Sequence, residues 1–392
     1  MTFPATLAIP PAVLGIAERL EGGGFETWCV GGALRDTLLG VANHDFDLTT
    51  QALPRDVQRL FSRTVPVGIE HGTVAVLDDE NHPHEVTTFR RDIHTDGRHA
   101  VVEFGVSLQD DLARRDFTIN AIAYHPLRHE WRDPFKGAAD LEARVIRAVG
   151  DPNWRFQEDY LRILRAVRFS ARFGFRIHPK TLDAARANVA GLAQLSAERV
   201  RDEWFKGIAT AQRLSKLVAL WQDIGAARIW LPEIGREDRG AALDHLPRDP
   251  VLITAFLAGD PASLLTRLKA ANREIERGRV IGAWRERYPD PRHLADVRRW
   301  LAQVGEYADD LLTLLPALTP RGTALTNLPA MVRAIRAAKD PLTLKELAVT
   351  GDDLLAKGVR PGPDVGAALE RLLAEVLEDP AKNTRDYLLA RV

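Results

Sequence analysis

Two different patterns of apolar and polar residues divide this chain near residue 150. Before that point, helical spacing of apolar residues is found in three segments, 11–21, 33–40 and 54–61. β-rich runs predict strands over 27–30, 45–49, 73–77, 84–89 and 101–106. A further helix is predicted from Ser107, where Asp110 completes a capping-type start. This mixture predicts an α+β domain with a roughly five-stranded mixed sheet.

After residue 153 the strand signals nearly vanish. Helical spacing predicts four helices in succession, over 154–172, 179–190, 197–210 and 214–222. The same texture, punctuated by Pro and Gly, continues to the end of the chain. With 392 residues the chain has room for two to four domains. We therefore expect a mixed head followed by an elongated all-α part.

Candidate chemistry lies in the head, after the first predicted strand. Asp45 and Asp47 stand two apart in an extended run, so both side chains project to one face while their apolar neighbours face the other way. Two carboxylates on one face can serve a pair of Mg²⁺ ions. The Gly31-Gly32 backbone, which lacks Cβ atoms, suits a polyphosphate. Together these features predict nucleotidyl transfer.

A third acidic residue belongs to the same prediction. Glu85 follows in the strand predicted over 84–89, and it lies beside the carboxylate pair if that strand is the sheet neighbour. The alternative is an exposed carboxylate on a strand. The two interpretations stay open at this point.

Overall charge changes this picture little. Hydrophobic residues make up 45% and charged residues 27% of the chain, with a formal net charge of −1. This balance argues against a protein coated with positive charge, although a local patch can still bind nucleic acid. Segment 267–299 is one candidate, because ten Arg and Lys stand there against five Asp and Glu, with Trp284 and Tyr288 among them. Solvated helix faces are the alternative explanation.

Cysteine use and hydropathy bear on the compartment. The single cysteine, Cys29, excludes a disulfide within the chain and fits a reducing compartment. The N-terminal residues lack the basic region of a secretory signal. The longest apolar stretches, such as 251–258, are far shorter than the ~20 residues of a membrane span. We expect a cytoplasmic protein with no membrane association and no implied protein partner.

Six segments, in order, resemble those of one enzyme family. They are Val-Gly-Gly-Ala-Leu-Arg-Asp (30–36), Asp-Phe-Asp (45–47), Gly-Ile-Glu-His-Gly-Thr-Val (68–74), Glu-Val-Thr-Thr-Phe-Arg (85–90), Arg-Arg-Asp-Phe-Thr-Ile-Asn-Ala (114–121) and Glu-Asp-Tyr-Leu-Arg-Ile-Leu-Arg (158–165). Over residues 24–205 the chain thus resembles the class II tRNA nucleotidyltransferases. This family holds the CCA-adding enzymes and bacterial poly(A) polymerases within the DNA polymerase β superfamily. Beyond residue 205 only the helical texture is similar.

The resemblance implies both an architecture and an activity. It implies a polymerase-β-like catalytic head (1–150), a neck that recognises the nucleotide base (151–212), a body (213–300) and a tail that binds tRNA (301–392). The implied enzyme adds the 3′-terminal CCA, or part of it, to tRNA from CTP and ATP without a template. The RNA 3′-hydroxyl attacks the nucleotide α-phosphate in line, and pyrophosphate is released.

The resemblance also implies roles for the head residues. Asp45 and Asp47 would hold two Mg²⁺ ions, which at ~4 Å apart can stabilise the attacking and leaving oxygens, and Glu85 would be a third catalytic acid. Nucleotide binding is implied for Gly31, Gly32, Arg35, Arg115 and Asn120. Arginine suits phosphate because its planar fork donates two hydrogen bonds. For Arg115, a charge on a helix surface is the alternative.

In the neck, the resemblance implies that Asp159 and Arg162 read the nucleotide base. They are three apart on a predicted helix and so project to neighbouring positions. A guanidinium can donate to N3 and O2 of cytosine while a carboxylate accepts from its N4 amino group, and adenine offers N1 and its N6 amino group. Uracil and guanine mismatch both groups, at ~1–3 kcal/mol for each buried polar group left unpaired. A surface ion pair is the alternative.

Arg165 and Arg168 also match positions of the family and are implied to take part in nucleotide binding. Each three-residue step along a helix, however, drifts by about 60°. The two side chains therefore cannot both point where Arg162 points. Contacts with phosphate, with tRNA or within the protein remain open for them.

Residues 90–100 depart from the family pattern. The family has a mobile loop there that helps to switch from C to A addition, and Asp96, Gly97 and Arg98 match it. The spacer before them looks about one residue short, His94 stands where Tyr is usual, and Ala100 replaces a common Pro. We expect full CCA addition. The alternatives are CC-only or A-only addition, a poly(A) polymerase, and a non-catalytic RNA-binding module.

Overall fold

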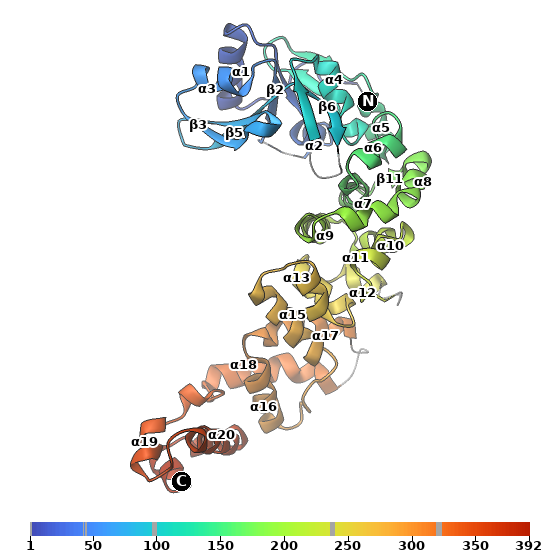
Figure 1. Cartoon of the computed structure of the whole chain (residues 1–392). Coiled ribbons are helices and arrows are strands. Elements are labelled where there is room, and N and C mark those ends of the chain that lie inside the picture. Colours follow the sequence, from blue (N-terminus) through green and yellow to red (C-terminus); the bar gives the residue numbers. More distant parts are fainter. Residues whose placement is uncertain (1, 42, 44, 96–99, 236–239, 319–323) are drawn as a thin grey trace. The chain divides into compact units, whose positions relative to one another are not determined.

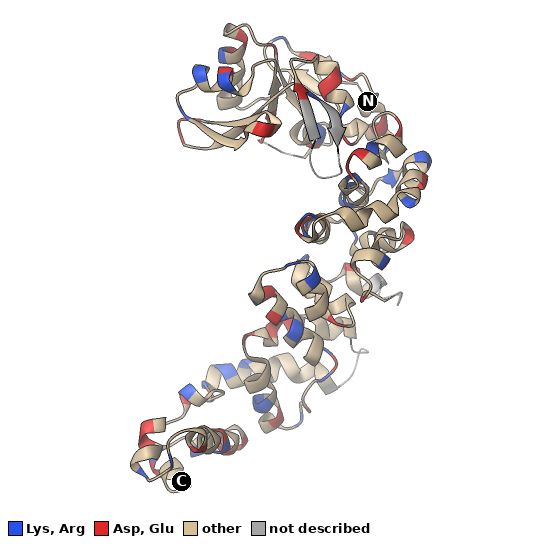
Figure 2. Cartoon of the chain, viewed as in Figure 1, with Lys and Arg blue, Asp and Glu red and all other residues tan. Residues whose placement is uncertain are grey.

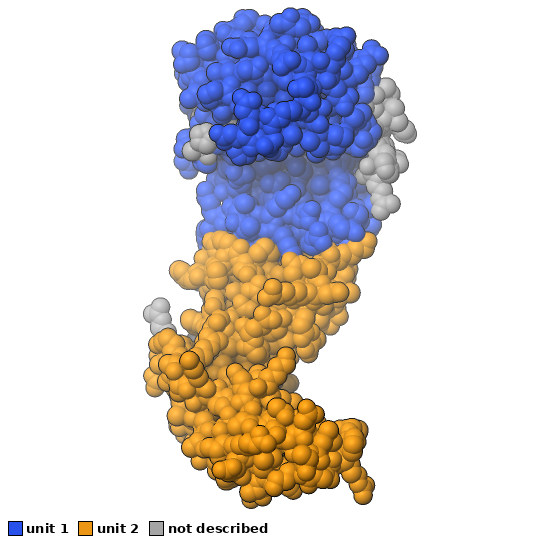
Figure 3. All heavy atoms as spheres, turned by 90° about the vertical axis from the view of Figure 1, so that its left-hand side faces the viewer, with its two compact units in different colours: residues 1–232 blue, residues 233–392 orange. Residues whose placement is uncertain are grey.

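The computed structural model describes residues 2–41, 43, 45–95, 100–235, 240–318 and 324–392 (Figure 1). The chain divides into two compact units, residues 1–232 and residues 233–392 (Figure 3).

A seven-stranded mixed sheet is the centre of the first unit. Its strands lie in the order β3 (Thr64–Gly68), β4 (Thr73–Leu77), β5 (Pro83–Thr88), β2 (Asp47–Thr50), β1 (Thr27–Val30), β8 (Ala123–His125) and β9 (Glu130–Arg132). Strands β2 and β5 run parallel, and the other neighbours are antiparallel. The α+β fold class and the mixed sheet predicted from the sequence are therefore confirmed.

The sheet is larger than the five strands expected, and the difference has local causes. Strands β8 and β9 have three residues each, too few to show a period of two. Strand β3 lies at the edge of the sheet and holds Pro66. A proline argues against a strand when only the sequence is known, but an edge strand can accommodate it. The run predicted over 101–106 forms β7 (Ala100–Phe104), but it pairs with β6 (Arg90–Thr95) in a separate two-stranded ribbon.

Apolar clusters cover both faces of the sheet. On one face, α1 (Pro11–Gly22) and α3 (Pro54–Leu60) pack through Val13, Leu20 and Val57 against a cluster that includes Leu48. On the other face, Trp28 and Val30 cluster with Leu112 of α4 (Leu108–Ala113). As predicted, α4 begins with a capping box formed by Ser107 and Asp110.

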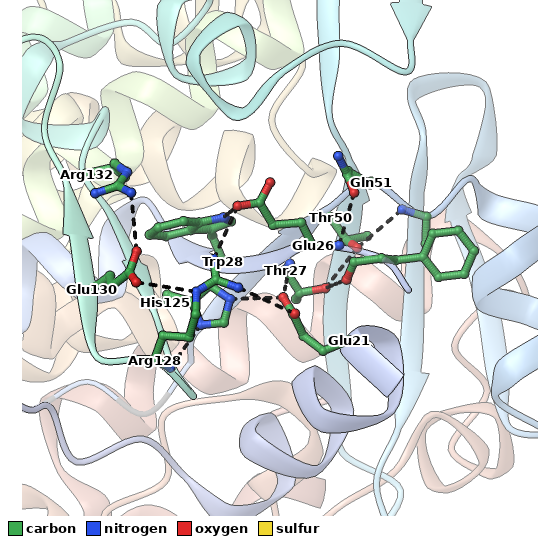
Figure 4. A network of polar contacts seen from close by, with 12 residues as sticks. Glu21, Glu26, Thr27, Trp28, Thr50, Gln51, His125, Arg128, Glu130 and Arg132 are labelled. Atoms are coloured by element: carbon green, nitrogen blue, oxygen red, sulfur yellow. Dashed lines mark hydrogen bonds and ion pairs between the residues drawn. The ribbon is translucent and has the colours of Figure 1, made fainter. Parts of the chain in front are cut away.

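A polar network fixes the start of β1, at the end of the strand opposite Gly31 (Figure 4). The imidazole of His125 lies 2.9 Å from Glu21, whose Oε1 also accepts a 2.7 Å hydrogen bond from the backbone N–H of Thr27. The guanidinium of Arg128 lies over the ring of Trp28, 5.6 Å from its centroid. Burial lowers the pKa of His125 despite its bond to Glu21. These contacts tie α1, β1 and β8 together.

Helices complete the first unit. After the 3₁₀ helix η2 (Thr118–Asn120) and α5 (Gly137–Glu142) come α6 (Pro152–Glu158), α7 (Leu161–Phe173), α8 (Pro179–Ala187), the 3₁₀ helix η3 (Val189–Gln194), α9 (Ala197–Thr210), α10 (Leu214–Asp223) and α11 (Ala226–Trp230). Strands β10 (Val145–Ile146) and β11 (Arg176–Ile177) form a small parallel pair. The helices predicted over 197–210 and 214–222 are confirmed as α9 and α10.

The single helix predicted over 154–172 is wrong, because the chain breaks between α6 and α7. Asp159 has extended backbone angles (φ −155°, ψ 105°). Its Oδ1 accepts a 3.1 Å hydrogen bond from the backbone N–H of Leu161, the first residue of α7. An aspartate side chain that bonds nearby backbone competes with the helix and favours such a break.

The second unit is built from helices, as its sequence texture predicts. They are α12 (Gly240–Asp244), α13 (Pro250–Leu257), α14 (Pro261–Arg267), α15 (Asn272–Trp284), α16 (Leu294–Val304), α17 (Ala308–Leu318), α18 (Leu328–Ala338), α19 (Gly351–Ala356), α20 (Pro363–Glu378) and α21 (Arg385–Leu389), with short 3₁₀ turns between some of them. Leu354, Leu372, Val376 and Leu388 lie in the apolar cluster that joins α19, α20 and α21. In the part of the chain that the structure describes, no helix combines the length and the hydropathy of a transmembrane segment.

Several arginines of segment 267–299 serve this unit internally. Arg277 pairs with Asp310 at 2.6 Å and with Asp249 at 2.9 Å. Arg285 is buried and donates a 2.7 Å hydrogen bond to the backbone carbonyl of Ala258. These contacts favour a structural explanation for part of the basic segment.

Candidate active site

The backbone after β1 brings a carboxylate and a guanidinium together. Val30 pairs with Asp47 of β2, and Gly31 follows with a φ of +81°. A Cβ atom on Gly31 would lie 3.3 Å from Nη1 of Arg115 and 3.7 Å from Oδ2 of Asp47. Only glycine combines this backbone conformation with so close an approach. The Gly31 backbone is therefore open to a ligand held between the two side chains.

The carboxylate pair has the predicted alternation, although the strand is shorter than expected. Phe46 and Leu48 are buried in the core, whereas Asp45 is exposed and Asp47 is partly exposed. Strand β2 begins only at Asp47, so Asp45 lies in the segment that leads into it. Parallel pairing of Leu48 with Val86 places Glu85 next to Asp47 in the sheet.

Burial and the charges of neighbouring acids act together on Asp47. Burial is the main cause that raises the pKa of Asp47 to about 6, and the charges of Glu85 and Asp45 raise it further, against a smaller opposite effect of Arg115. Negative charge at Asp47 is therefore poorly compensated within the protein. A cation would relieve this cost.

The donor set fits a divalent cation that also binds the substrate. In the described part of the chain, no three His, Cys, Asp or Glu side chains form a group that could hold a metal ion by themselves. Mg²⁺, however, is commonly held by one or two carboxylates together with phosphate oxygens of a nucleotide. Asp45 and Asp47 can supply those carboxylates.

A cavity of about 560 Å³ opens beside Gly31, Gly32 and Asp47. Its lining includes nine arginines, Arg35, Arg90, Arg114, Arg115, Arg162, Arg165, Arg168, Arg172 and Arg199, against three aspartates, Asp47, Asp116 and Asp159. Figure 2 shows blue, basic turns on α7, which carries four of these arginines. Such an excess of positive charge suits a polyanion. Asp45 instead borders a second cavity, together with Asp78 and His84.

Protein contacts hold the phosphate-binding candidates Arg35 and Arg115 in place. Arg35 is buried, donates to Asp36 and Asn120 at 2.7 Å and 2.5 Å, and has its guanidinium over the rings of Phe169 and Phe173. Arg115 pairs with the fully buried Asp111 at 3.2 Å. Its buried Nε has no hydrogen-bond partner among the described residues.

Asp116 orients two further residues of the cavity wall. Its Oδ1 accepts a 2.8 Å hydrogen bond from Asn120, and its Oδ2 accepts one of 2.8 Å from Arg165. Burial alone would raise the pKa of Asp116, but the charge of Arg165 and the bond from Asn120 lower it to about 2. Asp116 is therefore ionised at neutral pH. No role was predicted for Asp116 from the sequence, although it stands in the matching Arg-Arg-Asp run.

Asp159 and Arg162 both line the cavity, but they reach it from either side of the helix break. The expectation that they share one helix is therefore wrong. Asp159 pairs with Arg199 of α9 at 2.8 Å. Arg162 donates to Glu158 at 2.5 Å and to the backbone carbonyl of Arg114 at 3.1 Å. Each of the two side chains thus contacts other parts of the protein, which a simple surface ion pair between Asp159 and Arg162 would not require.

Arg168 faces a different partner from Arg162, as the helical drift predicts. It is buried and pairs with Glu203 of α9 at 2.6 Å.

Several residues of the cavity were not predicted from the sequence. One of them, Arg172, pairs with Asp36 at 2.8 Å. Arg90, Arg114 and Arg199 were missed as well; Arg199 lies forty residues after its partner Asp159, and no local pattern marks it. Asp96, Gly97 and Arg98 lie outside the described residues.

Comparisons with known proteins agree with this geometry. Three family models match: a poly A polymerase head domain over residues 27–147, a probable RNA and SrmB-binding site of polymerase A over residues 174–236, and a putative domain 2 of tRNA nucleotidyltransferase over residues 324–392. The CCA-adding enzyme of Levilactobacillus brevis is 37% identical over 402 residues, 96% of each chain. That of Limosilactobacillus fermentum is 35% identical, over 95% of this chain and 94% of its own.

A solved structure resembles the whole chain. The Bacillus stearothermophilus CCA-adding enzyme in complex with CTP superposes with a TM-score of 0.81 and 31% sequence identity. The match covers 98% of this chain and 97% of that one. The similarity therefore extends through both units.

Proposed function

Because the chain belongs to the family of CCA-adding enzymes, we propose that it adds the 3′-terminal CCA to tRNA from CTP and ATP without a nucleic-acid template. One observation carries this proposal. A single arginine-rich cavity holds both Asp47, beside the Gly31 backbone, and the pair Asp159 and Arg162. A nucleoside triphosphate needs these two ends, one for its phosphates and one for its base.

At the phosphate end, Asp45 and Asp47 would hold two Mg²⁺ ions together with phosphate oxygens. When bound, these ions would neutralise the triphosphate and favour ionisation of the RNA 3′-hydroxyl. The 3′-oxygen then bonds to the α-phosphorus while the bond to the bridging oxygen of the β-phosphate breaks, and pyrophosphate is released. Glu85, next to Asp47 in the sheet, is proposed as the third acid of this centre.

The arginines of the head are proposed to bind the phosphates. Arg115 has a buried Nε that lacks a partner, and its Nη1 lies against the Gly31 backbone. Arg35 is held by Asp36 and Asn120, so little conformational freedom is lost when a phosphate binds. Gly32 leaves room for a phosphate at the start of α2 (Gly32–Leu38).

At the base end, Asp159 and Arg162 are proposed to select cytosine and adenine. Arg162 donates to the ring acceptors, and Asp159 accepts from the exocyclic amino group. Arg199 and Glu158 restrain the two side chains. Uracil and guanine would leave both groups unpaired, at about 1–3 kcal/mol each.

The test is extension of defined tRNAs. The protein is incubated with Mg²⁺, labelled CTP or ATP, and tRNAs that end in the discriminator base, in C or in CC. Sequential addition of C, C and A supports the proposal, whereas products that stop after CC, or extension of only the CC-ended tRNA, indicate the partial activities. Long A tracts on other RNAs would indicate a poly(A) polymerase.

A matched pair of variants tests the catalytic assignment. Asp47→Ala should abolish addition, whereas Asp183→Ala, at an exposed carboxylate of α8, should leave it unchanged. Equal activity of Asp47→Ala and the wild type would contradict the assignment. We propose the cytoplasm as the site of this reaction, since a chain whose one cysteine is Cys29 can form no internal disulfide and suits a reducing compartment.

A further inference from the structure

The ring of Tyr160 lies against Gly191 at the point where the chain breaks between α6 and α7. Gly191 is buried in η3, and a Cβ atom on it would lie 2.1–2.3 Å from ring atoms Cε1, Cδ1 and Cζ of Tyr160. Such distances are far inside van der Waals contact. Any side chain at position 191 must therefore displace the ring.

The segment that receives this ring is itself held from two sides. The Asn188 side chain donates a 3.0 Å hydrogen bond to Asn153 and accepts one of 3.2 Å from Gln157, both in α6. On the other side, the indole N–H of Trp230 in α11 donates to the backbone carbonyl of Leu192 at 2.9 Å. The surface under Tyr160 is thus a fixed support.

Asp159, which directly precedes Tyr160, depends on this support. Its backbone leaves the helical path just before the anchored ring. One carboxylate oxygen accepts from the N–H of Leu161 and the other from Arg199. Because the peptide that joins residues 159 and 160 is rigid, the position of the Tyr160 ring limits the direction in which the Asp159 carboxylate enters the cavity.

We infer that Tyr160 and Gly191 are positioning residues, which hold Asp159 in the orientation that discriminates cytosine and adenine from uracil and guanine. The inference rests on the proposed function. It assigns nucleotide selection to a packing contact between two residues that do not line the cavity themselves. A displaced carboxylate would lose its bond to the amino group, and one such bond corresponds to about tenfold in discrimination.

The experiment measures kcat/KM for CTP and for UTP on tRNA that lacks CCA, together with the unfolding temperature. Gly191→Ala should lower the CTP-to-UTP ratio about tenfold, and so should Tyr160→Ala, while Tyr160→Phe, which keeps the ring, stays near the wild type. In the double variant Tyr160→Ala/Gly191→Ala the clash is absent. Its ratio should therefore equal that of Tyr160→Ala alone and not the product of the two single effects.

A control separates positioning from general damage to the helices. Gly207→Ala in α9 brings a Cβ atom to 3.1–3.2 Å from the methyl groups of Leu217. This change crowds the contact between α9 and α10. It should lower the unfolding temperature without changing the CTP-to-UTP ratio. An unchanged ratio in folded Gly191→Ala and Tyr160→Ala, or effects that simply multiply in the double variant, would overturn the inference.

Failure of a variant to fold and failure of the proposed function can each be told apart from failure of the inference. If Gly191→Ala does not fold, the comparison of Tyr160→Ala with Tyr160→Phe decides alone, and equal ratios for these two refute the inference. If the wild type extends no tRNA, the proposed function fails. A wild type that is active and selective, with variants that are equally selective, refutes only the positioning role.

Discussion

At the scale of single residues, Asp47 is the clearest case of a side chain that serves function at a cost to the fold. Burial, with Glu85 and Asp45 nearby, raises its pKa from its ordinary value of 3.8 to about 6. The folded state therefore binds a proton more tightly than the unfolded state. Stability is lost as pH rises between these two values, and the loss is complete above about pH 6. It amounts to at most about 3 kcal/mol.

Asp47→Asn should therefore stabilise the protein in EDTA. At pH 8 we expect a gain of up to about 3 kcal/mol over the wild type, and at pH 4 almost none, because there the wild-type carboxyl is largely protonated in the folded state. Urea unfolding at the two pH values measures this difference. Mg²⁺ with CTP should stabilise the wild type only. An equal gain at both pH values would contradict the electrostatic explanation, and exposed Asp183→Asn is the control.

Arg199 is a residue whose role follows only from the folded structure. It pairs with Asp159 at 2.8 Å from a separate helix. Arg199→Ala should raise KM for CTP and ATP about fivefold to tenfold, with kcat within about twofold, because the Asp159 carboxylate keeps only its bond from the Leu161 N–H and binds the base less well when less restrained. Steady-state kinetics measures this split. Arg186→Ala, which removes an exposed pair with Asp223, should leave both constants unchanged; a loss confined to kcat would refute the assignment.

At the scale of elements, α7 and α9 are joined by an ion pair that is almost out of solvent. Arg168 and Glu203 are only 8% and 5% exposed and lie 2.6 Å apart. Glu203→Ala should destabilise the protein by about 3–5 kcal/mol, because it leaves a buried guanidinium unpaired. Replacing both residues, as in Arg168→Met/Glu203→Leu, should cost much less. Urea unfolding of the single and double variants measures the coupling.

The control for this cycle is an exposed pair in the same unit. Arg186 and Asp223 lie 2.7 Å apart with side chains 43% and 48% exposed. Their replacement by Ala should change stability by less than about 1 kcal/mol. If Glu203→Ala costs no more than this, the buried pair does not hold α9 against α7.

Elements with strong local signals could be predicted from the sequence, and those that depend on distant contacts could not. Strand β4 and helix α9 match their predictions because alternation and helical spacing are visible in the residues themselves. Strand β8 could not be predicted, since its three residues are strand only through pairing with β1 and β9. The break at Asp159 was missed because the same apolar spacing runs through both helices. The Arg199 contact was missed because it joins residues far apart in the chain.

At the scale of the whole molecule, function depends on where charge is placed and not on its sum. The chain has a formal net charge of −1, yet nine arginines meet in one cavity. Every residue that lines this cavity falls between Gly31 and Arg199, within the first compact unit. Nucleotide binding should therefore depend on that unit alone, whereas binding of tRNA is proposed to need the second unit, which includes the region matched by a tRNA nucleotidyltransferase domain.

A fragment of residues 1–232 tests this division. It should unfold cooperatively and bind CTP with a Kd within about threefold of the full chain, because the cavity and its supporting helices are intact. Extension of tRNA should fall at least about a hundredfold, because phosphate contacts dominate the affinity of proteins for nucleic acids. Raising the salt concentration should weaken tRNA use by the full chain more steeply than CTP binding. Efficient tRNA extension by the fragment would show that the second unit is dispensable, and loss of CTP binding by a folded fragment would show that the cavity needs it.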